Sequence, residues 1–132
     1  MKEVRADIKD SEVLVEVKRL SANAAQQRGD ALHVATDDND ALLAGFFGEV
    51  QNEIVMVLSK YAKEDSGIVF TLPDNWDSAL EGVLKKRVKD AFVFGVLAKW
   101  FLLANESVYS TMFKGCIDEI HEVLNKRIRP VR

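Results

Sequence analysis

The side chains best suited to chemistry lie close together near the C-terminal end of the chain. Cys116 is the only cysteine, and Asp118 and His121 follow it, three residues apart. An Asp-x-x-His pair can supply two metal ligands, but metal sites in helical bundles draw on a second such pair and on carboxylates from other helices. The other histidine, His33, falls in a predicted loop. We therefore interpret Asp118 and His121 as part of a solvated helix face and predict no metal site.

The sequence offers no convincing nucleophile and base. Cys116 and His121 are five residues apart, so on a helix they point to different sides, and no third group is evident to orient the histidine. The paired carboxylates Asp37 and Asp38 are better explained as helix-capping residues. No glycine-rich phosphate loop is present. The sequence predicts no catalytic residue, no cofactor and no enzyme activity.

Length and composition indicate one helical domain over residues 1–132. Gly and Pro are scarce, at 7 and 2, so few turns are marked. The formal net charge of −3 disfavours a dedicated nucleic-acid binder, and one cysteine permits no internal disulfide. The most apolar stretch, 91–104, is 14 residues long and too short to span a bilayer. Residues 1–13 lack the apolar region of a signal peptide, so no secretion is expected.

Hydrophobic periodicity predicts a mainly α fold, with about four helices in a bundle. The first helix is expected over 12–27, although Val13-Leu14-Val15 also suits a strand. The second follows the cap residues at 36–40 and runs to about Lys63. The third, the longest, spans about 75–104 and is capped by Asp74 or Asn75. The fourth covers about 106–126.

Two segments are expected to be extended. Ile68-Val69-Phe70-Thr71-Leu72 is β-branched and aromatic and lies between Gly67 and Pro73. It has no obvious hairpin partner, so it either packs as a strap or pairs with a strand elsewhere, and an unpaired edge would invite another subunit. Residues 1–9 alternate only weakly and are expected to form a flexible arm.

The apolar stripes of the helices define a predicted core. Beyond Asp90 the third helix is apolar nearly all round, so several neighbours should bury it, and Gly95 should mark the close approach of another helix. The core is predicted to contain Phe46, Phe47, Val50, Ile54, Leu84, Phe92, Val96, Trp100, Met112, Ile117, Ile120 and Leu124.

The charges are unevenly distributed. Residues 1–65 carry 8 basic and 13 acidic side chains, and residues 66–132 carry 10 and 8. The two halves are either ordinary solvated surfaces or complementary surfaces for a like copy or a charged partner. The cluster Lys85-Lys86-Arg87-Lys89 has acidic neighbours, which favours an ion-paired helix surface over a DNA-binding stripe.

Partner-binding candidates are a tryptophan and the basic tail. Trp76 stands at the start of its helix and either staples the extended segment or anchors an interface. Arg127, Arg129 and Arg132 surround a helix-ending proline in a tail, 127–132, that is expected to be flexible. This tail is either simply disordered or a docking segment.

The order of these features resembles a family of viral proteins. An Asp-rich cap opens DDNDALLAGFFGEVQNEIVMVLSKYA, LPDNW ends the extended segment, AKWFLLAN lies in the long helix, and RIRPVR closes the chain. From about Glu12 to Arg132, this looks like the small helical head–tail connector, or head-completion, proteins of tailed phages and prophages.

The resemblance implies a non-enzymatic subunit. Several copies would form a ring beneath the portal and link the capsid to the tail, so the partners would be like copies and portal or tail proteins, with no membrane and no sequence-specific nucleic acid. The location would be the virion, or the bacterial cytoplasm during assembly. The alternative is a small cytoplasmic helical adaptor or regulator that binds a protein or DNA as a dimer.

Overall fold

The computed structural model describes residues 2–28, 35–65, 67–102 and 108–127, which form four α-helices and one small antiparallel sheet. The helices are α1 (Asp10–Arg28), α2 (Asp40–Val57), α3 (Glu81–Leu102) and α4 (Val108–Leu124). The strands are β1 (Lys2–Ala6), β2 (Ala62–Glu64) and β3 (Ile68–Leu72). The prediction of a mainly α fold with a short extended segment is confirmed.

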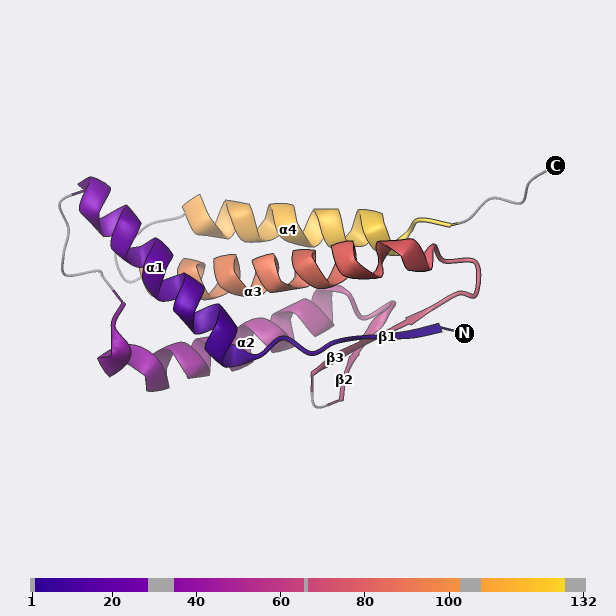
Figure 1. The fold of residues 1–132 in the computed structure, drawn as a ribbon, viewed down its shortest axis with the longest axis horizontal. Coiled ribbons are helices and arrows are strands. Elements are labelled where there is room, and N and C mark those ends of the chain that lie inside the picture. Colours follow the sequence, from indigo (N-terminus) through magenta and orange to yellow (C-terminus); the bar gives the residue numbers. More distant parts are fainter. Residues whose placement is uncertain (1, 29–34, 66, 103–107, 128–132) are drawn as a thin grey trace.

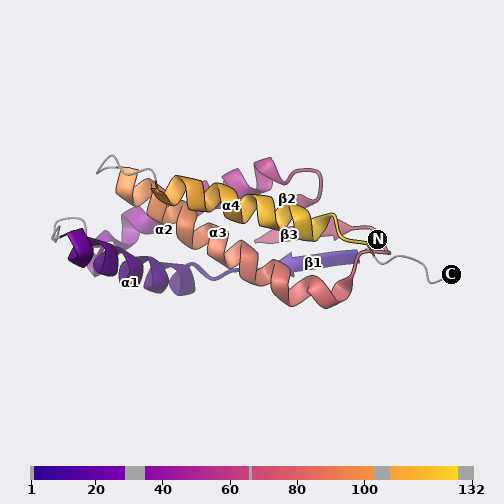
Figure 2. The same cartoon turned by 90° about the horizontal axis from the view of Figure 1, so that it is seen from above.

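The helix α3 lies at the centre of the fold and contacts α1, α2 and α4. Figures 1 and 2 show α4 running antiparallel along α3, with α1 and α2 on other sides of it. The apolar half of α3 fills the core, as expected from its sequence, since Phe92, Val96, Leu97 and Trp100 are all buried.

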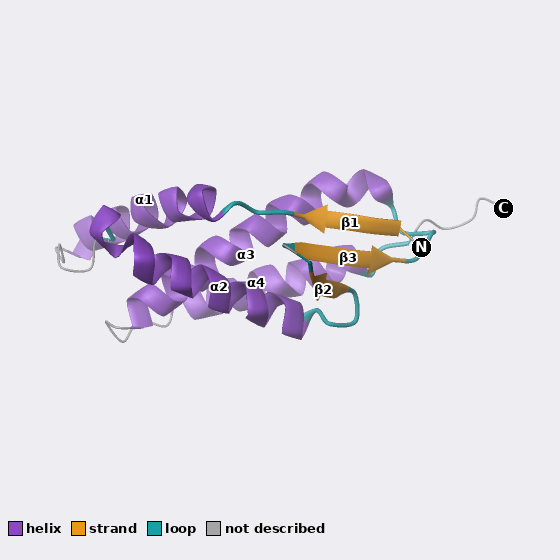
Figure 3. Ribbon diagram, turned by 90° about the horizontal axis from the view of Figure 1, so that it is seen from below, coloured by secondary structure: helices purple, strands orange, loops and turns teal. Residues whose placement is uncertain are grey.

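The extended segment 68–72 is the middle strand of a sheet with the order β1-β3-β2. In β1 the antiparallel register places Val4 opposite Phe70, and in β2 it places Lys63 opposite Val69. Of the two alternatives for this segment, pairing with strands elsewhere is the one observed. Figure 3 shows the sheet at one end of the molecule with helices behind it.

Two expectations are corrected by this sheet. Residues 2–6 do not form a loose arm, because their backbone pairs with β3 and Val4 and Ala6 are buried. The second helix ends at Val57 rather than near Lys63, because the chain turns back and Ala62–Glu64 pair with β3. Gly67 permits the turn between β2 and β3 with a φ of 144°, where any Cβ would collide with Asp7.

The long helix begins later than predicted. Asp77 caps a short 3-10 turn, Ser78–Leu80, by accepting a hydrogen bond from the Ala79 amide (3.0 Å), and α3 follows from Glu81. The turn that contains Trp76 stands apart from the helix, with the Trp76 amide donating to the Pro73 carbonyl (3.0 Å). The cap residue is therefore Asp77 and not Asp74 or Asn75.

The predicted core is largely correct. Nine of its twelve residues are buried, and Phe46 and Phe47 are partly buried against the core, where Phe47 stacks on Phe92 with 4.4 Å between ring centroids. The exception is Met112, which is 41% exposed. It lies one turn after the exposed Val108 and one turn before Cys116, at the edge of the buried stripe of α4 that contains Ile117, Ile120 and Leu124.

Candidate docking groove between α2 and α4

The reactive side chains of α4 do not form a site. Cys116 is buried, and burial raises the pKa of its thiol to about 11, with the carboxylates of Asp90 and Glu119 adding to the effect. Such a thiol stays protonated at neutral pH and is a poor nucleophile. Asp118 is exposed and His121 half-buried, and the described residues hold no group of three or more potential metal ligands.

Trp76 acts inside the fold. Its side chain is fully buried, and its indole nitrogen donates a hydrogen bond to the Val123 carbonyl in α4 (3.0 Å). The Lys2 ammonium in turn donates to the Trp76 carbonyl (3.0 Å). Trp76 is therefore hydrogen-bonded to α4 and β1, and a ring with no exposed surface cannot anchor a partner.

Arg127 is also engaged within the chain. Its guanidinium donates to the Leu124 carbonyl (2.7 Å) and to the Tyr61 hydroxyl (3.4 Å), and that hydroxyl donates to the Asn125 side chain (2.7 Å). A cation that binds the last carbonyls of a helix stabilises its C-terminal end. Arg129 and Arg132, the other two predicted partner-binding residues, lie outside the described residues.

The basic cluster on α3 is partly ion-paired. Lys85 contacts Glu81 (3.1 Å), and Arg87 contacts Glu119 on α4 (3.0 Å). Lys86 and Lys89 have no ion pair with any described residue. The ion-paired surface predicted for this cluster therefore holds for two of its four members.

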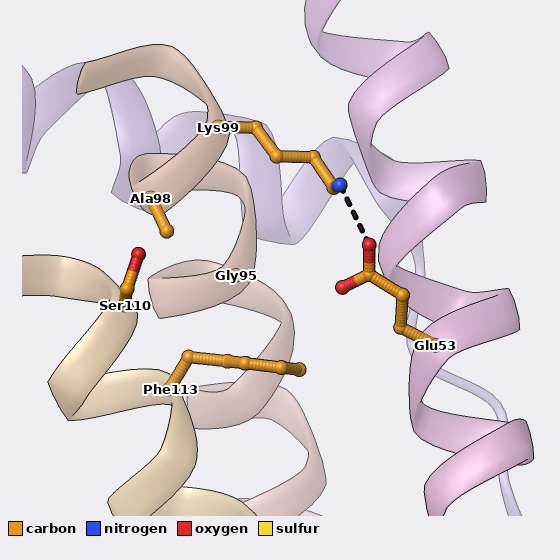
Figure 4. A pocket seen from close by; sticks show the side chains of 6 residues that line it. All are labelled: Glu53, Gly95, Ala98, Lys99, Ser110 and Phe113. Atoms are coloured by element: carbon orange, nitrogen blue, oxygen red, sulfur yellow. Dashed lines mark hydrogen bonds and ion pairs between the residues drawn. The ribbon is translucent and has the colours of Figure 1, made fainter. Parts of the chain in front are cut away.

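A groove lies between α2 and α4, with α3 as its floor. Figure 4 shows its inner part, where Gly95 and Ala98 of α3 face Ser110 and Phe113 of α4. On the α2 side of the groove the Lys99 ammonium donates to Glu53 at 2.7 Å.

The groove continues along α4 into a more apolar part. Its lining residues are Val57 of α2 and Ser110, Thr111, Phe113, Lys114, Ile117 and Asp118 of α4. At its edge Val57 is 51% exposed and the adjacent Met56 is 72% exposed. An apolar floor with a sparse polar rim can take the apolar side chains of a partner protein.

The Lys99 ammonium ties α2, one side of the groove, to α3, its floor. It also contacts Glu49 at 3.6 Å, so one lysine of α3 forms ion pairs with two carboxylates of α2. Burial alone would lower the pKa of Lys99, but the hydrogen bond and charge of Glu53, helped by Glu49, raise it overall. The lysine therefore stays charged, and the cross-link persists through the neutral range.

Sequence reasoning did not identify this groove. Val57 belongs to the apolar stripe of α2, so its position in the sequence predicts that it is buried. The sequence around Met56 does not indicate that its side chain is exposed. The groove depends on α2 and α4 both packing on α3 while leaving a space between them, which is a tertiary property.

Among the described residues no helix is both long enough and apolar enough to cross a bilayer. Comparison of the chain with protein-family models, with curated proteins and with solved structures finds no match in any of the three.

Proposed function

We propose that this protein is a non-enzymatic assembly subunit of the head–tail connector type, which forms an oligomeric ring between the portal and the tail of a phage particle. The observation that carries the proposal is the exposed apolar surface at the α2–α4 groove. Met56 and Val57 remain open to solvent there, beside charged residues that could orient a partner. Exposed apolar surface next to a polar rim is typical of protein–protein contact sites.

Two further features support the proposal. The first is the sequence resemblance to connector proteins, which rests on the order of elements and on LPDNW, AKWFLLAN and RIRPVR. The second is the buried core that supports the surface: α3 is buried along its C-terminal half, Trp76 donates to Val123 of α4, and Arg127 donates to Leu124 and to Tyr61. A rigid scaffold of this kind suits a subunit that meets several neighbours in a fixed geometry.

The direct experiment is inactivation of the gene in the genome that carries it, followed by electron microscopy of the particles produced on induction. The proposal expects filled heads and free tails that fail to join, with restoration by the wild-type gene supplied on a plasmid. A Val57→Asp variant that folds normally should restore joining poorly. Normal particles after inactivation, or the absence of particle genes around this one, would refute the assignment.

A further inference from the structure

The exposed face of α2 is apolar and acidic. Leu42, Met56 and Val57 are 45%, 72% and 51% exposed, respectively. The helix carries the acidic residues Asp40, Glu49 and Glu53 and no basic residue. Asp40 contacts Lys18, and Glu53 binds the Lys99 ammonium closely. Glu49 contacts the same ammonium only at 3.6 Å, and its side chain is 60% exposed. A cation from outside the chain can reach it.

The first turns of α3 present the opposite charge. On a helix with 100° between successive residues, Lys85, Lys86 and Lys89 fall within one sector, whereas Arg87 points away to Glu119 on α4. Lys86 is exposed and makes no ion pair with any residue that the structure describes, and Val83 beside it is 43% exposed. Lys85 is paired with Glu81, and Lys89 is half-buried near Glu16 of α1. The unpaired positive charge of this face is therefore that of Lys86, which lies beside the exposed Val83.

The two faces cannot meet within one chain. Figure 3 shows α2 and β2 at one edge of the sheet and the first turns of α3 beyond the opposite edge, next to β1. They can meet between two chains, because an acidic face with exposed apolar side chains is complementary to a basic face of the same kind.

We propose that like copies of this chain associate head to tail, with the α2 face of one copy (Leu42, Glu49, Met56 and Val57) against the basic face of α3 (Val83, Lys86 and Lys89) of the next. The inference rests on the proposed function, since it names the partner of the α2 side of the groove. A contact between two different faces leaves an open chain of copies with one free α2 face at one end and one free α3 face at the other, so it propagates until a ring closes. This is the symmetry that a connector requires.

A charge-reversal cycle tests the pairing. Glu49→Lys and Lys86→Glu should each weaken self-association roughly fivefold, the size of a 1 kcal/mol charge effect, and the double variant should recover most of the loss. Sedimentation at low and high salt provides the measurement, because the wild-type association should fall as salt rises. Glu3→Lys, an equal charge change on β1, is the control and should leave association unchanged. Equal losses in the control, or no recovery in the double variant, would contradict the pairing.

Cross-linking tests the head-to-tail geometry itself. In a Cys116→Ala background, a chain with both Glu49→Cys and Lys86→Cys should give a ladder of oligomers with a short bis-maleimide. A mixture of the two single-cysteine chains should give dimers only, and each single chain alone should give monomer. Monomer alone from the double-cysteine chain, or dimers from Glu49→Cys by itself, would overturn the arrangement. Either cross-linking outcome would contradict the head-to-tail arrangement without contradicting the assembly function. Normal particles after gene inactivation would refute the assembly function even if the cross-linked ladder formed.

Discussion

A Cβ atom placed on Gly95 would lie 2.7 Å from Cγ1 of Val50, so α2 and α3 approach one another more closely at this point than any side chain on Gly95 would permit. The aromatic ring of Phe113 lies 3.1 Å from the same position. The glycine therefore marks the point where three helices meet. Its helix-propensity cost of about 1 kcal/mol is offset by this packing.

Gly95→Ala should destabilise the protein by about 1–3 kcal/mol, because the valine and phenylalanine must shift to admit the methyl group. Chemical denaturation followed by circular dichroism measures the change. Gly48→Ala on α2 is the matched control, since nothing lies within 4 Å of a Cβ there. It should be neutral or stabilising by up to about 1 kcal/mol. Equal effects from the two substitutions would contradict the close approach.

Trp76→Phe should cost about 1–3 kcal/mol, because it removes the indole donor and leaves the Val123 carbonyl without that partner. Trp76→Ala should cost about 3–5 kcal/mol, because it also leaves a cavity. Urea unfolding curves for the three proteins give the comparison. A phenylalanine variant as stable as the wild type would mean that the hydrogen bond contributes nothing.

Arg127→Ala should lower the free energy of unfolding by about 1 kcal/mol, as the loss of a helix cap does, because the Leu124 carbonyl loses its donor. Arg127→Lys should recover only part of the loss, since an ammonium cannot reproduce the forked contacts to Leu124 and Tyr61. Thermal melts of the two variants beside the wild type test this. A loss in the alanine variant that lysine fully restores would indicate that charge alone matters.

The Cys116 thiol predicts a pH dependence. Its pKa is about 11 in the folded chain against an ordinary value of 9.0, so the folded state holds the proton more tightly than the unfolded state. Its contribution to stability is present below pH 9 and is lost as the pH rises toward 11. The difference in unfolding free energy between wild type and Cys116→Ala should therefore shrink across that range. A constant difference would contradict the raised pKa.

The helices could be predicted from sequence because their apolar residues repeat at three- and four-residue spacing. The buried half of α3 and the role of Gly95 followed from that pattern alone. The sheet could not, because β2 has three residues that read as the end of α2, and β1 pairs with residues more than 60 positions away. The sequence of Lys2–Ala6 contains no signal that this segment pairs with Ile68–Leu72.

The candidate site was less predictable than the fold. Trp76 and Arg127 were selected by residue type, and both prove to bind other parts of the same chain. Met56 and Val57 carry the exposed surface, yet their exposure depends on where α2 ends and how α4 packs on α3. The sequence shows the basic cluster on α3. It does not show that Arg87 is ion-paired and Lys86 is not, because that depends on where the fold places Glu119 of α4.

The most direct test of self-association is the mass of the purified protein in solution. Light scattering during size-exclusion chromatography measures it over a series of salt and protein concentrations. We expect a species whose mass is a multiple of the 14.8 kDa chain and which forms more readily at low salt and high concentration. Met56→Ser should reduce the amount of this species, whereas Val15→Ser, at another exposed apolar position on α1, should not. A constant mass of one chain under all these conditions would contradict self-assembly through the α2 face.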